Sequence, residues 1–529
     1  MYKVLVSDSL AREGVDILEK AEGIDVDVKT GLSPEELGVI IGSYDGLVIR
    51  SATNVTADII EKAENLKIVG RAGIGLDNVD IPAASKRGIV VMNTPGGNTT
   101  TTAEHAVAMM MALARKIPQA TSSMKEGKWE KKKFMGSEVC NKTLGIIGIG
   151  RIGSIVANRA QGLKMNVVAH DPYIAPEAAE KMGITLADTL DDVLARADFI
   201  TLHSPLTNET REIINKDTIA KMKDGVFIIN CARGKLVNEG DLFDALTAGK
   251  IAGASLDVFQ EEPTKNSALL DLDNVIATPH LGASTDEAQR NVAIAVAEQV
   301  VAYLKKGEIK NAVNMPSVSA DVMARIKPYL NLAEKLGIFQ AQITLGGIEE
   351  VAVEFSGELL DYDVSPITIA ILKGLLTPIL NENINYINAP IIARERGIKV
   401  VESKSTEQKD YKGMIGLSLT TTKESTYTAG AIFGREAPRI VRINKFTLDV
   451  VPEGYMIVLY NSDKPGVIGN IGTALGENGI NIARLHLGRE QVDGKALVVL
   501  STDGPVPDTV VSQLKALPHV ISATTLEMK

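Results

Sequence analysis

The sequence predicts an α/β protein built from parallel sheets with helices on both faces, followed by two smaller mixed units. A chain of 529 residues is too long to fold around one hydrophobic core, and at about 150 residues per domain this length favours three or four domains. Short β-branched runs alternate with helical stretches from residue 1 to about 305, which is the pattern of a parallel sheet. After Pro452 the order of elements changes. The chain is therefore expected to be modular.

The composition is that of a globular protein that works in water. Hydrophobic residues make up 45% and charged residues 23% of the chain, and no run approaches the roughly 18 apolar residues of a membrane span. The net charge of −10 and the pI of about 5.4 argue against a nucleic acid or an anionic membrane as a partner. The sequence starts on an apolar run without the basic segment of a signal peptide. Cys140 and Cys231 are too few for a disulfide framework and lack metal-ligand spacing, so we expect a cytoplasmic protein without a metal site.

The predicted strands of the α/β part are short, apolar and separated by helical stretches. They cover residues 3–6, 46–49, 68–70, 143–149, 166–169, 199–202 and 226–230. A first unit is expected over roughly residues 1 to 95. A second begins near Thr101, because Thr101 and Glu104 have the spacing of a capping box before a helical pattern. A long helical pattern over residues 281–305 is expected to return to the first unit.

The rest of the chain divides near Pro452. Residues 316–452 have mixed strand and helix patterns but no catalytic spacing. The elements predicted beyond them are strands at 455–460, 481–487, 496–501 and 520–526, helices at 465–477 and 508–516, and a turn at 491–494. This βαββαβ order is that of the ferredoxin-like split arrangement.

A glycine-rich run after a buried strand predicts a dinucleotide site. Gly148, Gly150 and Gly153 have the G-x-G-x-x-G spacing, and a helical pattern follows from Arg151. The first glycine permits the turn, the second lets a pyrophosphate approach, and the third allows the helix to pack on the strand. Asp171 lies 18 residues after Gly153, where a carboxylate binds ribose hydroxyls and repels a 2′-phosphate. The predicted cofactor is therefore NAD rather than NADP.

Three residues after the glycine loop predict the oxidation of an alcohol. Removing a hydride from a secondary alcohol requires a base for the hydroxyl proton and a cation for a neighbouring carboxylate. Arg233 follows a predicted strand and so lies at the carboxyl edge of the sheet. Glu262 and His280 come later, and a Glu paired with a His favours the imidazolium. Each residue alone also has a simpler interpretation: Arg233 as a partner in a structural ion pair, Glu262 as a solvated carboxylate and His280 as an ordinary loop histidine.

In order and spacing, these motifs resemble the D-2-hydroxyacid dehydrogenase family over about the first 305 residues. The matching residues are the glycine loop with 170–172, then 231–234, 262–263 and 279–280, together with 70–80, 93–96 and 128–136. Within that family the whole chain resembles the long forms, which oxidise 3-phospho-D-glycerate to 3-phosphohydroxypyruvate with NAD, the first step of the phosphorylated pathway of L-serine biosynthesis. The resemblance implies a doubly wound parallel-sheet (Rossmann-like) NAD domain inserted in a flavodoxin-like substrate domain.

The resemblance also implies roles for single residues. Arg233 would bind the substrate carboxylate, Glu262 would orient and charge His280, and His280 would take the proton. The residues expected to contact NAD are Gly148, Gly150, Arg151, Ile152, Gly153, Asp171, Ser204, Cys231, Ala232, Arg233, Asp257, His280, Leu281, Gly282 and Ala283.

A substrate phosphate needs cations of its own, because a dianion does not leave water for a neutral pocket. Arg50 and Arg71 each follow a predicted strand of the first unit and are candidates, with Ser51 and Gly73 beside them. Lys131 lies in a lysine cluster that reads as a solvated face. In the resembled family this segment crosses to a neighbouring subunit and can approach the substrate, so Lys131 is a candidate as well.

Residues 461–469 and 479–481 resemble the ACT domain, a small regulatory module that binds amino acids. A Pro-Gly turn at a helix N-terminus offers amide donors to a carboxylate, while Asp463 and Asn481 can receive an ammonium, with Asn461 as a further candidate. In the resembled family the ligand is L-serine, bound between two such domains. The alternative is a module that only dimerises.

The expected division is a substrate-binding domain over 1–95 and 283–310, an NAD-binding domain over 96–282, an α+β intervening regulatory domain over 316–452 and an ACT domain over 453–529. The expected assembly is a homotetramer. Two other functions remain open: a dehydrogenase for another D-2-hydroxy acid, such as glycerate, and a non-catalytic NAD sensor that binds proteins. Arg233, Glu262 and His280 argue against the sensor.

Overall fold

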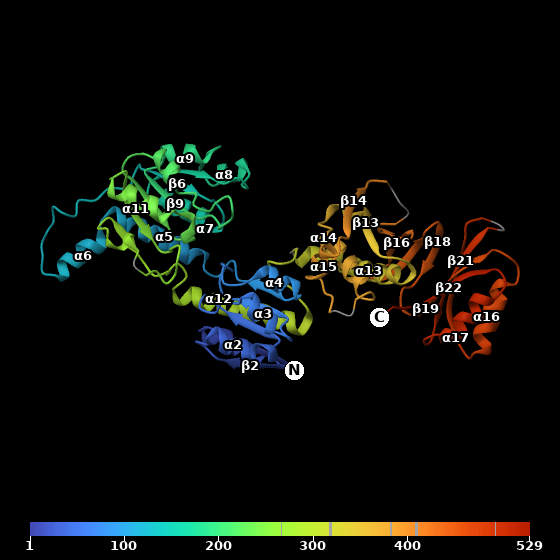
Figure 1. Ribbon diagram of the computed structural model, residues 1–529. Coiled ribbons are helices and arrows are strands. Elements are labelled where there is room, and N and C mark those ends of the chain that lie inside the picture. The colour runs from blue at the N-terminus through green and yellow to red at the C-terminus, as the bar shows by residue number, and fades with distance from the viewer. Residues whose placement is uncertain (266, 317–319, 381–382, 408–410, 492–493, 529) are drawn as a thin grey trace.

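The protein folds around four β-sheets, one for each stretch of the chain, as a computed structural model shows (Figure 1). The structure describes residues 1–528 except 266, 317–319, 381–382, 408–410 and 492–493. The predicted α/β class is confirmed. No helix in the described part of the chain is both long and apolar enough to cross a membrane.

The first sheet is parallel and has the order β2-β1-β3-β4-β5, which is the flavodoxin order. Its strands are β1 (Tyr2–Val6), β2 (Ile24–Val28), β3 (Gly46–Ile49), β4 (Ile68–Arg71) and β5 (Val90–Asn93). The helices are α1 (Arg12–Lys20), α2 (Pro34–Ile40), α3 (Ala57–Lys62), α4 (Ile81–Lys86) and, from much later in the chain, α12 (Asp286–Lys306). Val292, Val296 and Val300 of α12 are buried against Val4 and Ile68 of the sheet, so the chain returns to its first unit (Figure 1).

The second sheet lies within this unit in sequence and is parallel throughout, with the order β12-β11-β10-β9-β6-β7-β8. Its strands are β6 (Thr143–Ile147), β7 (Asn166–His170), β8 (Thr185–Leu186), β9 (Phe199–Leu202), β10 (Val226–Asn230), β11 (Ile251–Leu256) and β12 (Val275–Ala277). The helices are α5 (Thr99–Ala114), α6 (Ile117–Lys125), α7 (Arg151–Gly162), α8 (Pro176–Lys181), α9 (Leu190–Arg196), α10 (Lys216–Ala220) and α11 (Glu239–Thr247). Consecutive β6 residues Ile146 and Ile147 belong to different apolar clusters, so both faces of the sheet are covered. This is the doubly wound arrangement, with its order reversing between β6 and β9.

The third sheet has the order β14-β13-β15-β16-β17-β18 and is antiparallel except for the β13–β14 pair. Its strands are β13 (Ile348–Gly357), β14 (Lys399–Ser405), β15 (Gly413–Thr421), β16 (Ser425–Phe433), β17 (Ala437–Ile443) and β18 (Phe446–Val450). The helices are α13 (Ala320–Ile343), α14 (Ser365–Leu376) and α15 (Ala389–Glu395). Gly337 and Gly374 lie where α13 and α14 pack with no room for a side chain.

The fourth sheet is antiparallel with the order β20-β21-β19-β22, as a ferredoxin-like βαββαβ unit requires. Its elements are β19 (Gly454–Ser462), α16 (Val467–Glu477), β20 (Ile482–Arg489), β21 (Lys495–Thr502), α17 (Asp508–Ala516) and β22 (Val520–Met528). Ile457 and Leu459 face α16 and α17, whereas Met456 and Val458 join the apolar cluster of the third sheet. The last two units therefore share one core.

Two predicted helix starts are wrong. Helix α5 begins at Thr99, so Thr101 lies inside the helix, and its hydroxyl is 3.3 Å from that of Thr285. Helix α12 begins at Asp286, capped by Thr285, whose hydroxyl accepts a hydrogen bond from the Ala288 amide. The preceding residues 281–284 form a loop after β12, in which Leu281 and Gly282 donate their amides to the Asp257 carboxylate. Two residues of the turn predicted at 491–494 lie outside the described part of the chain.

Candidate active site

A cleft of about 660 Å³ lies between the first and second sheets, at the carboxyl ends of their strands. Residues of both α/β units line it, as expected for a ligand site in doubly wound folds. The predicted site residues on its wall are Arg50, Ser51, Arg71, Gly73, Arg151, Ile152, Ser204, Cys231, Ala232, Arg233, Glu262, His280, Gly282 and Ala283. Residues more than 200 positions apart in the sequence thus share one cavity.

The glycine loop joins β6 to α7 beside this cleft. Gly148 has φ +93 and donates its amide to the His170 carbonyl, while Gly150 is exposed at the N-terminus of α7. A side chain on Gly153 would collide with the Gly148 carbonyl. The amides at the start of a helix have no partners within it, and they carry a partial positive charge. The loop therefore fits a dinucleotide pyrophosphate.

Asp171 follows β7 and connects to the loop. Its Oδ2 accepts the Ile149 amide at 2.9 Å, and its Oδ1 accepts the Tyr173 amide at 2.9 Å. Because a carboxylate has about four acceptor sites, ribose hydroxyls can still bind. Asp171 thus both anchors the glycine loop and places a negative charge where the sequence predicts the adenosine ribose.

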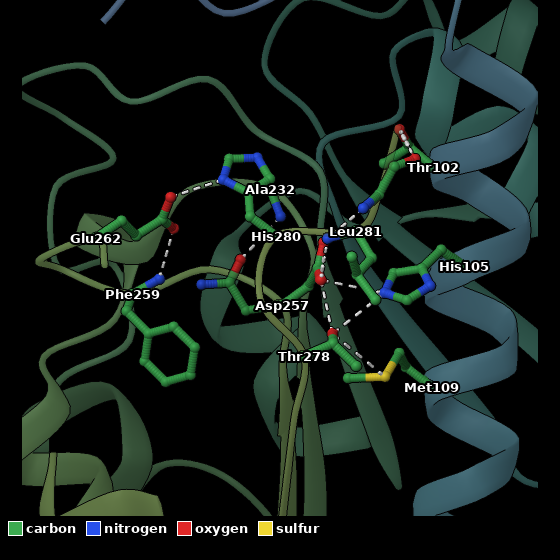
Figure 2. A network of polar contacts seen from close by, with 12 residues as sticks. Thr102, His105, Met109, Ala232, Asp257, Phe259, Glu262, Thr278, His280 and Leu281 are labelled. Atoms are coloured by element: carbon green, nitrogen blue, oxygen red, sulfur yellow. Dashed lines mark hydrogen bonds and ion pairs between the residues drawn. The ribbon is translucent and has the colours of Figure 1, made fainter. Parts of the chain in front are cut away.

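His280 and Glu262 form an ion-pair geometry that opens onto the cleft. Nδ1 of His280 lies 2.7 Å from Oε2 of Glu262, and Oε1 of Glu262 accepts the Phe259 amide at 3.0 Å (Figure 2). Burial raises the pKa of Glu262, but the hydrogen bonds from His280 and Phe259 outweigh it and hold this pKa below its usual value. Glu262 is therefore ionised at neutral pH and orients the ring, so that Nε2 of His280 is left for a proton.

Three guanidinium groups converge on the same cleft. Arg71 is largely buried, and its pKa falls to about 10 because of burial and of the nearby charge of Arg233. Its Nε has no hydrogen-bond partner among the described residues. Burial also lowers the pKa of Arg50, whose NH1 donates to the Ser9 carbonyl. Such a concentration of cations, which repel one another when the cleft is empty, favours a ligand with more than one negative charge.

Arg233 reaches across from the second sheet to the first. Its Nε donates to Oδ2 of Asp77 at 2.8 Å, and its NH1 donates to the Ala232 carbonyl at 2.7 Å. A side chain on Gly75 would collide with NH2 of Arg233, so this glycine makes room for the guanidinium. Arg233 is thus fixed between the two units with its remaining donors at the cleft.

Some predicted residues lie elsewhere. Gly148, Gly150, Gly153, Asp171, Asp257 and Leu281 are not among the cleft-lining residues, and the first four belong to or anchor the loop beside it. Lys131 is exposed on the segment after α6, which extends away from both sheets (Figure 1). Within one chain, the structure does not bring Lys131 to the substrate cations.

The predicted effector residues do not form one site within one chain. Asn461 pairs with Ala496 at the start of β21, whereas Ile482, the neighbour of Asn481, pairs with Thr502 at its end. At ~3.3 Å per residue, these two ends of β21 are roughly 20 Å apart. Asn481 therefore lies far from Asn461 and Asp463. Asn481 donates instead to Asp503 at 2.8 Å. Within one chain, Asp463 and Asn481 therefore do not face the same ligand. This separation agrees with the expectation that the ligand is bound between two such domains, which stays a prediction.

The sequence analysis missed His105 of α5, which lies behind the site. Its Nε2 is 3.2 Å from Oδ1 of Asp257 and 3.3 Å from the Thr278 hydroxyl (Figure 2). His105, Cys231 and Asp257 have the ligand types of a metal site, but both Asp257 oxygens already accept hydrogen bonds. A polar histidine inside the apolar run from Ala103 to Ala114 was the available signal.

Three family models match the chain. Residues 107–282 match the D-isomer specific 2-hydroxyacid dehydrogenase NAD binding domain, residues 325–444 the D-3-phosphoglycerate dehydrogenase intervening domain, and residues 455–519 the ACT domain. Together they cover the second sheet and most of the third and fourth sheets.

Relatives match over the full length. A protein named D-3-phosphoglycerate dehydrogenase from Synechocystis sp. is 47% identical over 100% of this chain and 95% of its own length. A protein of the same name from Archaeoglobus fulgidus is 47% identical over 99% of this chain and 100% of its own length. The Bacillus subtilis protein of that name is 42% identical over 100% of both chains.

Among solved structures, Aquifex aeolicus D-lactate dehydrogenase complexed with NAD and lactic acid is 28% identical with a TM-score of 0.54, covering 60% of this chain and 100% of its own. The TT0316 protein of Thermus thermophilus is 33% identical with a TM-score of 0.55, covering 59% and 99%.

Proposed function

The chain belongs to the D-3-phosphoglycerate dehydrogenase family, and we propose that it oxidises 3-phospho-D-glycerate to 3-phosphohydroxypyruvate with NAD, the first step of the phosphorylated pathway of L-serine biosynthesis. One observation carries the substrate assignment. Arg50, Arg71 and Arg233 share a cleft with the His280–Glu262 pair. A substrate with a carboxylate at one end and a phosphate at the other matches this arrangement of cations around a single proton acceptor.

The chain's own residues supply binding and proton transfer. Arg233 holds the substrate carboxylate and polarises the 2-oxygen through its fork of donors. His280 takes the hydroxyl proton at Nε2, and ionised Glu262, 2.7 Å from Nδ1, stabilises the resulting imidazolium. NAD, when bound, accepts the hydride. The proton and the hydride thus leave the substrate for different acceptors.

We assign phosphate recognition to Arg50 and Arg71, with Ser51 and Gly73 beside them. The buried Nε of Arg71, which has no partner within the described part of the chain, supports this role, because a buried donor without a partner costs free energy that a bound anion would recover. Lys131 approaches the substrate only if it comes from a neighbouring copy.

The cofactor is NAD. Most of the predicted NAD residues line the cleft or belong to the glycine loop, and the charge of Asp171, which anchors this loop, opposes a 2′-phosphate. Asp257 and Leu281 do not line the cleft but adjoin Gly282, which does.

We further propose regulation by L-serine through the ACT domain of a cytoplasmic homotetramer. The proposed domains are 1–95 with 283–310, 96–282, 316–452 and 453–529. The separation of Asn481 from Asn461 and Asp463 supports an effector site shared by two chains, since no single chain can assemble it.

The reverse reaction offers a direct test. Purified enzyme with NADH should reduce 3-phosphohydroxypyruvate far faster than pyruvate, because only the first substrate carries a phosphate for Arg50 and Arg71. Equal rates would favour the alternative of a dehydrogenase for another D-2-hydroxy acid. No NADH oxidation with any 2-oxo acid, despite measurable NADH binding, would favour a non-catalytic sensor.

A further inference from the structure

Helix α5 reaches behind the cleft and holds the loop that carries His280. The loop follows β12 and contains Thr278, Leu281 and Gly282 (Figure 2). Thr102 of α5 donates its hydroxyl to the Gly282 carbonyl at 2.8 Å, and His105, one turn later, contacts Asp257 and Thr278. Two side chains on one face of the helix therefore fasten the loop from behind.

Asp257 is the centre of these contacts. It follows β11, is fully buried, and accepts hydrogen bonds from the Thr278 hydroxyl at 2.6 Å and from the amides of Leu281 and Gly282 at 2.7 and 2.8 Å. Burial raises the pKa of Asp257, but hydrogen bonds from His105, Thr278 and Leu281 lower it further than burial raises it. Asp257 is thus a buried anion, and His105 is the side chain beside it that can carry a positive charge.

The same aspartate fixes the backbone of His280. The His280 amide donates to the Asp257 carbonyl at 2.9 Å, and His280 has φ +56, a left-handed conformation that a residue with a Cβ rarely adopts. Such a conformation persists only where the surroundings determine it. Asp257 therefore holds three consecutive residues, of which the first carries the proton-accepting ring.

We propose that His105 is a positioning residue: by holding the Asp257 carboxylate against the loop amides, it keeps His280 in the geometry for proton transfer. The proposal rests on the proposed function only for the identity of the reaction. His105 does not line the cleft, so it acts through Asp257 rather than on the substrate. Its loss should slow the chemical step and leave phosphoglycerate binding intact, with a smaller effect on NAD binding, because Asp257, Leu281 and Gly282 are also proposed NAD contacts.

The test compares three variants on α5. His105→Leu removes the hydrogen bond and keeps an apolar side chain, His105→Gln keeps an Nε2 donor, and Met109→Leu is the control. Met109 is buried one turn beyond and contacts the Thr278 hydroxyl only through its sulfur at 3.9 Å. A shift of about 1 Å at a reacting group can cost about 10²-fold in rate. We expect His105→Leu to lower kcat by about 10- to 100-fold, with KM for phosphoglycerate within about threefold and a rise in KM for NAD that is smaller than the loss in kcat. His105→Gln should recover part of the loss, and Met109→Leu should match the wild type.

Two further readouts separate positioning from general stability. Substrate deuterated at C2 should show a larger isotope effect on kcat in His105→Leu, because hydride transfer becomes rate-limiting. Hydrogen exchange should be faster in a peptide covering residues 276–286, with unchanged exchange in β6 and α7. An unchanged kcat, a rise in KM alone, or equal losses in Leu and Gln variants with faster exchange throughout the domain would each overturn the proposal.

Failure of the proposed function would look different. If the wild type oxidises no phosphoglycerate but oxidises another 2-hydroxy acid, the same ratios are measured with that acid. If it oxidises none, the exchange comparison alone decides whether His105 holds the loop, since exchange requires no substrate.

Discussion

Proton transfer is proposed to depend on the imidazole of His280. Replacing His280 with Ala removes the acceptor but leaves the glycine loop and the arginines in place, so kcat should fall by about 10² to 10⁴, the usual range for losing a general acid or base. NAD affinity should stay nearly intact. Steady-state kinetics with NAD titration by fluorescence measures both, and unchanged turnover would remove His280 from the mechanism.

Phosphate recognition depends on a buried guanidinium. Arg71→Ala should lower kcat/KM for 3-phospho-D-glycerate by about 10- to 100-fold, the loss expected for a hydrogen bond to a charged group, and affect D-glycerate much less. Equal losses with both substrates would make Arg71 a structural residue.

The pH dependence provides a second check on Arg71. Its pKa of about 10 means that the side chain is a cation below this pH and becomes neutral above it. Since kcat/KM reports the free enzyme, this quantity should fall for the wild type with phosphoglycerate as pH rises through about 10. The fall should be absent in Arg71→Ala and weak with D-glycerate.

Charged residues that directly follow predicted strands could be assigned to one cleft from the sequence, because the carboxyl ends of parallel strands meet at one edge of a sheet. Arg50, Arg71 and His280 all line it. His105 was not predicted, because the signal in its helix is weak: its partner Asp257 is 152 positions away in the sequence, and a histidine in an apolar helix is usually a core residue. The role of Lys131 stays a prediction, because it was expected to approach the substrate of a neighbouring copy and one chain cannot test this.

At the scale of elements, the glycine loop and β7 act as one unit. Because Asp171 also accepts the Ile149 amide, Asp171→Ala should weaken NAD binding through both the ribose and the loop. Asp171→Asn keeps one acceptor for the amide and removes the charge. Both variants should accept NADP better than the wild type, and Asn should retain more NAD affinity. An unaltered NAD to NADP preference in both, measured by kcat/KM, would contradict the assignment.

Elements with a strong period were predictable, but only some of their boundaries were. Helix α17 matches the expected range 508–516 residue for residue, and α7 begins at Arg151 as expected, whereas α5 and α12 begin elsewhere. The strands β2, β5, β8, β11 and β12 were not among those predicted. In β2, aspartates alternate with apolar residues, which is an available signal of a half-buried strand, whereas β8 has only two residues. The distance between Asn481 and Asp463 depends on how β19 and β20 pair with β21, and this pairing cannot be derived from the local sequence around either residue.

At the scale of the molecule, the last two sheets share a core, and this determines how regulation can be tested. Removing residues 453–529 would expose apolar residues of β18, such as Phe446 and Leu448, so truncation would confuse lost regulation with lost stability. A point change in the effector site is the cleaner experiment.

Inhibition by L-serine should therefore be tested with Asn481→Ala. An effector acts only through its different affinity for two states of the assembly, so loss of the binding group should abolish inhibition and leave kcat without serine unchanged. The control is Asn478→Ala, whose side chain caps α16 and contacts Gln513. Calorimetry that detects no serine binding to the wild type, or inhibition that persists in Asn481→Ala, would leave the domain as an assembly module.

The substrate itself is tested most directly by the forward reaction of the purified full-length enzyme. NADH formation is measured with NAD and, in turn, 3-phospho-D-glycerate, D-glycerate and D-lactate at matched concentrations and pH. The three converging arginines predict a kcat/KM for the phosphorylated acid at least about 10²-fold above that of D-glycerate, since the phosphate adds charge-assisted hydrogen bonds worth about 1.5 to 3 kcal/mol each. A kcat/KM for D-glycerate or D-lactate equal to or above that for 3-phospho-D-glycerate would contradict it.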